Sequence, residues 1–339
     1  MSLAVPVTVD NFRRAQTDRY FAITVRDAGG IGRLRHQREV MPIDRQAVVR
    51  SNRDTLYSSG VFDLDAGPVT ITLPDPGKRF LSLMVIDEDH CAPIVAYGDG
   101  TYTITRDRIG TRYALVAMRT LADPGDPVDL DQAHHLQDAM VVEQKARGSF
   151  EVPSWDEASL NKVRGALVVL GETLPDSKRM FGARESVDPV RHLIGTAIGW
   201  GGNPEKDATY LIVTPKRNDG ETVYGLTVRD VPVDGFWSVS VYNGAGYFEP
   251  NEQNAYSLNS ITAQRSGDGS VTIQFGGCDR RTPNCLPIVA GWNYTVRLYR
   301  PRAEILEGRW RFPEARVVER HATPSVGDVR ARGDQRPRP

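Results

Sequence analysis

The chain has 339 residues, of which 40% are apolar and 25% are charged, and its formal net charge is −1. This composition is typical of a globular protein of about two domains, and the near-neutral charge argues against a nucleic-acid partner, because binding to phosphates requires a positive surface. We find no signal peptide and no run of about 18 apolar residues, so we expect no membrane partner and predict a cytoplasmic location.

Residues 1–125 predict an N-terminal β-rich domain with a leading helix. Apolar residues at helical spacing from Phe12 to Val25 predict the helix, and Gly29 and Gly30 mark its end. Alternating or apolar runs then predict strands at residues 69–73, 80–87, 101–106 and 113–119. Turn signals separate these strands at short, regular intervals, which favours a sandwich or barrel over βαβ units.

A helical bridge is predicted for residues 126–185. One helix is expected at 129–147, after a break rich in proline, glycine and aspartate. A second helix is expected to begin with a capping box, in which Ser154 caps the helix and Glu157 follows three residues later. Its apolar face follows at helical spacing: Leu160, Val163, Leu167 and Leu170.

Residues 186–318 predict a second β-rich domain. Strands are expected at 209–214, 223–229, 236–242, 257–264, 271–275 and 294–299. Residues 319–339 are basic, rich in proline and poor in apolar side chains, so we expect a disordered tail. The predicted fold class is therefore mainly β with a helical insert: two antiparallel β-rich domains, the C-terminal one a jelly-roll-like sandwich, bridged by about two amphipathic helices.

The three cysteines leave the redox state of the chain open. Cys91 stands alone, whereas Cys278 and Cys285 bracket a short polar loop. In an oxidising compartment this pair closes the loop as a disulfide, and in a reducing cytosol the two thiols stay free. A zinc site is disfavoured because the spacing is not CxxC and no histidine is near. No P-loop, GxGxxG or HExxH motif is present, so we expect neither a metal nor an organic cofactor.

The densest polar segment of the first half contains Asn52, Arg53, Asp54 and Tyr57. Arginine binds carboxylates through two parallel hydrogen bonds, and asparagine and aspartate bond readily to nearby backbone. One hypothesis is a ligand clamp in which Arg53 binds a carboxylate. The alternative is a buried polar staple that fixes a chain reversal.

A second polar cluster follows the apolar strand at 80–87, where Glu88, Asp89 and His90 are consecutive. His90 is a candidate general base, with Asp89 as the acid that orients it. The same side chains suit a hard-cation site, although alternation along an extended chain places Asp89 and His90 on opposite faces. The alternative without chemistry is a solvated strand end.

A third cluster combines Arg191 and His192 with a glycine-rich turn around Trp200. His192 is a candidate acid–base catalyst because histidine titrates near neutral pH, and the alternative is a core histidine with satisfied hydrogen bonds. Glycines allow close backbone approach, so the turn is expected to pack the two halves together. In the strand at 236–242, alternation places Tyr242 on a mixed face suited to line a pocket.

Several motifs in a fixed order resemble a known tandem family. They are NRDTLYS at 52–58, RHLIGTAIGWGG at 191–202, GFWSVSVYN at 235–243, DGSVTI at 268–273 and NCLP at 284–287. With the closing motifs at 296–301 and 306–310, they resemble the domains of unknown function 1254 (N-terminal) and 1214 (C-terminal). The resemblance implies two β-rich domains, the second jelly-roll-like, and no particular reaction. Cys285 departs from larger members, which often carry tryptophan there.

Three functions are compatible with these residues. The first is a cofactor-independent hydrolase or lyase acting on a small molecule in a polar pocket between the domains, although no GxSxG elbow is present. The second is a non-catalytic sandwich module that binds a sugar or lipid head group, and the third is a structural scaffold; a homo-oligomer is compatible with each. The candidate catalytic residues are Asp54, Asp89, His90 and His192, and the candidate ligand-binding residues are Asn52, Arg53, Tyr57, Arg191, Trp200 and Tyr242.

Overall fold

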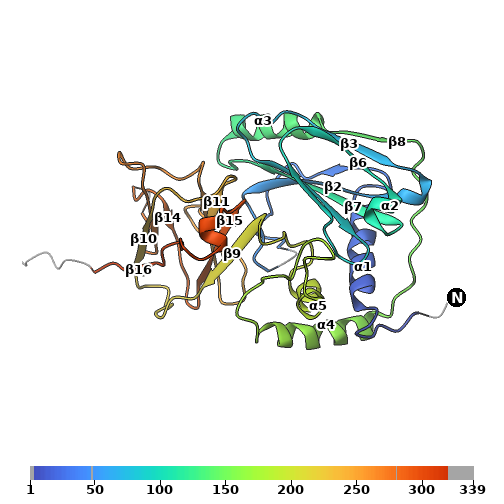
Figure 1. Cartoon of the computed structure of the whole chain (residues 1–339). Coiled ribbons are helices and arrows are strands. Elements are labelled where there is room, and N and C mark those ends of the chain that lie inside the picture. Colours follow the sequence, from blue (N-terminus) through green and yellow to red (C-terminus); the bar gives the residue numbers. More distant parts are fainter. Residues whose placement is uncertain (1–3, 47–48, 280, 320–339) are drawn as a thin grey trace, which may run out of the picture.

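A five-stranded and a three-stranded sheet build the N-terminal half of the computed structural model, which describes residues 4–46, 49–279 and 281–319 (Figure 1). The larger sheet has the order β1 (Arg35–His36), β2 (Thr55–Asp63), β7 (Tyr113–Leu121), β4 (Leu81–Asp87) and β5 (Ile94–Tyr97). The smaller sheet has the order β6 (Gly100–Ile104), β3 (Val69–Leu73) and β8 (Val141–Gln144). Neighbouring strands are antiparallel in both sheets.

Both faces of the larger sheet are covered. One face packs against the smaller sheet around Phe62, Val85 and Val116, which are fully buried. The other face, which includes Met84, packs against helix α1 (Phe12–Asp27) and Trp200. This double burial explains why β4 is apolar at almost every position rather than alternating.

Three helices share an apolar core on the second face of the larger sheet (Figure 1). They are α1, α4 (Glu157–Gly171) and α5 (Pro189–Ile198). The core residues are Val7, Phe12, Ala15, Leu160, Leu167, Ile194 and Ala197. The other helical elements of this half are the 3₁₀ turn Leu64–Ala66, α2 (Arg106–Ile109) and α3 (Pro127–Asp138). No helix in the described ranges has both the length and the apolar character needed to span a bilayer.

Two four-stranded sheets face each other in the C-terminal half. One has the order β12 (Ser257–Asn259), β11 (Trp237–Tyr242), β15 (Asn293–Tyr299) and β9 (Ala208–Val213). The other has the order β14 (Cys285–Leu286), β13 (Val271–Phe275), β10 (Tyr224–Val228) and β16 (Arg316–Val317), with α6 (Ala303–Leu306) preceding β16. Their shared core includes Val239, Ile273 and Trp292. Cys278 and Cys285 form a disulfide, and Cys91 is a free, buried thiol.

The bounds of both predicted helices in the bridge are wrong. The first ends at Asp138, and residues after it form β8, because Val142 packs into the core between the two N-terminal sheets and pairs with β3. The capping box at Ser154 does not form. Instead, Asp156 caps α4 by accepting the Ser159 N–H at 2.8 Å, where a carboxylate also complements the positive end of the helix dipole.

Helix α5 bears on the predicted limits of the domains. Helix α5 falls inside the segment 186–318 that we assigned to the C-terminal domain, yet its apolar face packs against α1 and α4. The division at residues 125 and 185 therefore stays a prediction. The predicted tail at 319–339 lies, apart from Glu319, outside the described residues.

Gly60 in β2 and Gly165 in α4 offer a matched pair of alanine substitutions. A Cβ on Gly60 would lie 2.2 Å from the carbonyl oxygen of Arg33, whereas nothing lies within 4 Å of a Cβ on exposed Gly165. We expect Gly60→Ala to lower the free energy of unfolding by about 1–3 kcal/mol, because the clash is with backbone and not with the end of a flexible side chain. We expect Gly165→Ala to raise it by about 0.5–1 kcal/mol. Urea unfolding followed by circular dichroism measures both, and a destabilised Gly165→Ala with a neutral Gly60→Ala would contradict this packing.

Candidate functional site

The candidate residues from the sequence fall in three separate places. At the junction between the larger N-terminal sheet and the sandwich lie Asn52, Arg53, Asp54, Tyr57 and Tyr242. In a buried cluster beside α1 and α5 lie Asp89, His90, His192 and Trp200. Arg191 lies apart from both, bonded to Asp176 and to the Lys178 carbonyl in the loop before α5. They do not line one shared pocket.

His90 is buried and fully bonded within the protein. Its Nδ1 lies 2.9 Å from the Thr196 hydroxyl oxygen, and its Nε2 accepts the backbone N–H of Gly201 at 2.8 Å. Because Nε2 accepts a hydrogen bond, the proton of the neutral ring belongs on Nδ1. Burial holds the pKa of His90 well below its usual value, and the nearby His192 and Arg13 act in the same direction to a smaller extent.

His192 is equally enclosed. Its Nδ1 donates to the Met180 carbonyl at 2.7 Å, and its Nε2 lies 3.1 Å from the Asp89 carbonyl oxygen and 3.8 Å from the Cys91 sulfur. Burial lowers the pKa of His192 below its usual value. The Asp89 carboxylate instead bonds to Arg14 and Arg184, so it orients neither histidine.

These contacts are those of structural histidines, and the catalytic role suggested for them stays a prediction. Trp200 stacks on His90 with ring centroids 5.4 Å apart, so the glycine-rich turn closes the cluster from one side. Within the described ranges, no group of three or more His, Cys, Asp or Glu side chains has an arrangement that could hold a metal ion.

Arg297 on β15 is the centre of the domain junction. Its guanidinium is 3% exposed and donates to the hydroxyls of Ser240 at 2.9 Å and Tyr242 at 2.6 Å on β11. It also donates to the backbone carbonyls of Arg50 at 2.8 Å and Ser51 at 3.3 Å, which precede β2. A buried cation is tolerated only when its donors are satisfied, so the sandwich recognises this stretch of N-terminal backbone.

Asp54 lies close to Arg297 and is fully buried. One carboxylate oxygen accepts from the Asn259 amide at 3.2 Å, and the Asp54 backbone N–H donates to Asn52 at 2.6 Å. Burial raises the pKa of Asp54, although Arg297 and the Ser238 hydroxyl act in the opposite direction. Asp54 therefore ties the start of β2 to the sandwich.

Arg53 and Tyr242 also serve the protein itself. The Arg53 guanidinium donates to the Met41 carbonyl and lies 5.2 Å from the centre of the Tyr256 ring. The Tyr242 hydroxyl donates to the Ser51 carbonyl at 2.7 Å. These contacts favour the polar staple over the ligand clamp, in which Arg53 would have to bind a carboxylate.

An open groove of about 670 Å³ runs along β9, an edge strand of the sandwich. It exists because β16, the edge strand of the facing sheet, pairs over only two residues and leaves the inner face of β9 without a covering strand. Helix α6 and the segment that follows it cover that face in part. The apolar lining comes from Leu211, Val213, Val296, Leu298, Ile305, Leu306, Trp310 and Phe312.

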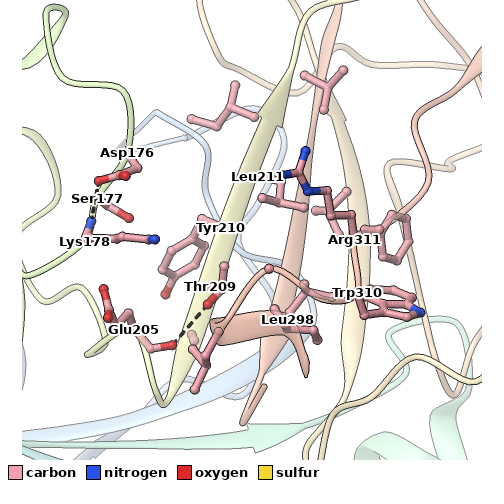
Figure 2. A pocket seen from close by; sticks show the side chains of 18 of the residues that line it. Asp176, Ser177, Lys178, Glu205, Thr209, Tyr210, Leu211, Leu298, Trp310 and Arg311 are labelled. Atoms are coloured by element: carbon pink, nitrogen blue, oxygen red, sulfur yellow. Dashed lines mark hydrogen bonds between the residues drawn. The ribbon is translucent and has the colours of Figure 1, made fainter. Parts of the chain in front are cut away.

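Polar side chains form the opposite wall of the groove. They come from the loop before α5 and from the start of β9: Asp176, Ser177, Lys178, Glu205 and Thr209. Figure 2 shows Lys178 and Glu205 on the side of β9 where Tyr210 lies, and Leu211 and Trp310 on the other side. The groove therefore wraps over the strand edge and joins a mainly apolar wall, which also carries Arg311, to a polar one.

Sequence reasoning missed the side chains that organise both the junction and the groove. Arg119 and Arg297 each interrupt an apolar strand pattern, and that interruption is a usable signal, because a charge inside a buried strand requires partners. Tyr210 and Trp310 carry no such signal. Their role depends on how β9 and the segment after α6 meet in three dimensions.

Two family models match the chain, one on each side of the junction. Residues 31–98 match a family described as a protein of unknown function, DUF1254, and residues 213–303 match one described as a protein of unknown function, DUF1214. The two matches follow one another along the chain, which confirms the tandem resemblance predicted from its motifs. No curated protein matches the chain.

Two solved structures share the fold. The VPA0106 protein from Vibrio parahaemolyticus is 18% identical, with a TM-score of 0.68 over 92% of this chain and 98% of that one. An uncharacterised protein from Burkholderia cenocepacia is 12% identical, with a TM-score of 0.50 over 91% of this chain and 88% of that one. At such identities the likeness concerns the fold alone. The predicted fold class, mainly β with two β-rich domains, is confirmed.

An acidic group on α1 adds a pH-dependent feature to the buried histidine cluster. Asp18 is 1% exposed, and one of its carboxylate oxygens accepts the Trp155 indole N–H at 2.9 Å. Burial raises the pKa of Asp18 to about 6, and the negative charges of Glu88 and Asp89 act in the same direction. Folding therefore stabilises the neutral carboxyl relative to the ionised one, and the neutral form predominates only below about pH 6.

This shift predicts that ionised Asp18 destabilises the fold near neutral pH. A folded-state pKa about two units above the unfolded one contributes about 3 kcal/mol, which is fully present below pH ~4 and is lost as pH rises through ~6. Asp18→Asn keeps the acceptor for Trp155 and removes the titration, so its stability relative to the natural protein should rise between pH 4 and pH 7. Urea unfolding at a series of pH values measures the difference. Asp10→Asn, at an exposed position, is the control, and a flat difference for Asp18→Asn would contradict the assignment.

Proposed function

We propose that the protein binds a small amphipathic molecule in the groove along β9 and does not itself catalyse a reaction. The observation that carries this proposal is the groove of about 670 Å³ with one apolar and one polar wall. Small-molecule sites typically enclose about 300–1,000 Å³, with a mostly apolar lining and a few polar groups that orient the ligand.

The two walls suit a ligand with an apolar body and a polar head, such as a lipid. The body would lie against Leu211, Leu298 and Trp310, which extend the sandwich core to the surface. The head would meet the polar wall. That wall carries both signs of charge, with Lys178 beside Glu205, so hydrogen bonding rather than net charge would select the head.

The state of the candidate catalytic residues supports binding over a hydrolase or lyase. Both histidines are buried. His90 bonds to protein groups through both ring nitrogens, and His192 bonds to the Met180 carbonyl through Nδ1 while its Nε2 is enclosed by the Cys91 thiol and the Asp89 carbonyl. A general base must reach a substrate proton directly or through one water molecule. At the junction, Arg53, Asp54 and Tyr242 bond to protein groups and hold the two halves together, which is a structural role.

The cytoplasmic location and a homo-oligomeric state stay predictions. The disulfide between Cys278 and Cys285 supports an oxidising compartment instead, because glutathione and thioredoxin keep most cytosolic thiols reduced.

Leu306 gives a direct test of the groove, because it lines the groove and its side chain is already 37% exposed. Titration with Nile red, an uncharged fluorescent probe, should show saturable binding to the natural protein. Leu306→Asp places a charge against the apolar wall and should weaken the probe by about tenfold or more, equivalent to about 1.4 kcal/mol.

The matched control is Ile261→Asp, which introduces the same charge at an aliphatic residue that is 49% exposed and lies outside the groove. This variant should bind Nile red as the natural protein does. A second groove variant, Trp310→Ala, removes an aromatic wall without adding charge and should also weaken the probe. Equal affinity in all four proteins, or no binding to the natural protein, would overturn the proposal.

A further inference from the structure

A row of side chains crosses the larger N-terminal sheet where it meets the sandwich. The strand register places Tyr57 on β2, Arg119 on β7, Ser82 on β4 and Tyr97 on β5 side by side. Alternation puts this row on the face that also carries Met84, the face covered elsewhere by α1. At this end of the sheet, tyrosine side chains of the sandwich cover the face that α1 covers elsewhere.

Arg119 is the charged member of the row and has no acidic partner. Its Nη1 donates to the Tyr57 hydroxyl at 2.6 Å, and the centre of its guanidinium lies 4.9 Å from the centre of the Tyr57 ring. In the described ranges it forms no ion pair with a carboxylate. Burial acts to lower the pKa of Arg119, but the adjacent Tyr57, Tyr299 and Tyr210 raise it, so the side chain stays cationic.

The three tyrosine hydroxyls around Arg119 each already accept a hydrogen bond. Tyr57 accepts from Arg119, Tyr299 accepts from the Asn52 amide at 2.9 Å, and Tyr210 accepts from the Asn203 amide at 3.0 Å. Each hydroxyl therefore has its own proton left to donate. Within the described part of the chain, none of the three donates to a protein acceptor. The site presents donors from a guanidinium and three phenols, and the described residues offer these phenol protons no protein acceptor.

The charge around the site indicates a monoanion. Besides Arg119, the charged groups close to the site are Arg297, which has Asp54 beside it, and, along the row, Arg300, whose guanidinium lies 4.5 Å from the centre of the Tyr97 ring, with Asp207, which accepts from the Tyr97 hydroxyl at 2.8 Å. Each of these two arginines has an aspartate nearby that offsets it, which leaves the single positive charge of Arg119. A dianion such as a phosphate monoester would remain half uncompensated.

We propose that Arg119, together with the hydroxyls of Tyr57, Tyr210 and Tyr299, binds the carboxylate of a small organic monoanion. A guanidinium and a carboxylate match in shape and form two parallel hydrogen bonds, and the phenol protons complete the set of donors. Asn52 and Asn203 are positioning residues that hold two of the hydroxyls with their protons directed away. This proposal does not depend on the groove.

Benzoate is a suitable probe, with benzamide as the uncharged analogue and phenyl phosphate as the dianionic one. Isothermal titration calorimetry on the full chain, in a buffer without chloride or carboxylates, should show saturable binding of benzoate. Benzamide should bind at least tenfold more weakly, because it lacks the charge that Arg119 meets. Tighter binding of phenyl phosphate than of benzoate would overturn the carboxylate assignment.

Substitutions then locate the site. Tyr57→Phe removes one phenol and keeps the ring under Arg119, and it should weaken benzoate about tenfold, as should Arg119→Lys, which keeps the charge and loses the planar fork. Tyr102→Phe, at a tyrosine that donates only to the Asp99 carbonyl, should leave benzoate binding unchanged.

The groove variant Leu306→Asp separates the two proposals, because it should weaken Nile red and leave benzoate unchanged, whereas Tyr57→Phe should do the reverse. Should Arg119→Lys fail to fold, Tyr57→Phe and Tyr299→Phe carry the test, because neither residue lines the groove. Benzoate binding that is absent in the natural protein, or equal in folded Tyr57→Phe, would overturn the proposal.

Discussion

The arrangement of the two halves depends on one buried guanidinium. Arg297 lies inside the junction, and burying a cation costs several kcal/mol unless its donors are satisfied. The guanidinium donates some of its hydrogen bonds to two hydroxyls of β11 and the others to the backbone carbonyls just before β2. The N-terminal backbone must therefore approach the sandwich at that point. Once it does, Asn52 and Asp54 are fixed, β2 enters its sheet in register, and Tyr57 comes to lie beside Arg119. The junction site is thus a consequence of the contact that holds the halves together.

The polar residues of this chain separate into two kinds, and residue type does not distinguish them. His90, His192 and Arg53 belong to types that often carry chemistry, yet protein groups occupy their hydrogen-bonding atoms. The tyrosines around Arg119 are less suggestive in the sequence, yet they retain protons that no protein acceptor takes in the described residues. Unused hydrogen-bonding capacity at a largely buried junction is costly unless water or a ligand takes it up. It is therefore a better guide to a binding site here than the presence of a histidine.

The sequence could predict the elements that follow from a local pattern of apolar residues, and it could not predict those that depend on contacts in three dimensions. The strands at 69–73 and 271–275 were predicted with the bounds that the structure shows, because their apolar residues alternate without interruption. Strand β2 has no predicted counterpart, since its polar start serves the junction and interrupts the pattern. The mixed face of β11 that includes Tyr242 was predicted to line a pocket, and it faces the junction. The groove had no sequence signal, because it depends on the short pairing of β16 and on where the segment after α6 passes β9.

Tyr210 connects the two proposed sites, since it lines the groove and its hydroxyl lies near Arg119. It sits on β9, whose outer edge has no neighbouring strand in the described residues, so its backbone is held by β15 alone. A carboxylate that bonds to the Tyr210 hydroxyl would fix the ring and with it one side of the groove, and a molecule in the groove would act on the same ring from the other side. Any such coupling must be reciprocal, because binding free energies around a closed cycle sum to zero. The edge strand is therefore the element through which occupancy of the apolar groove and of the cationic junction would influence each other.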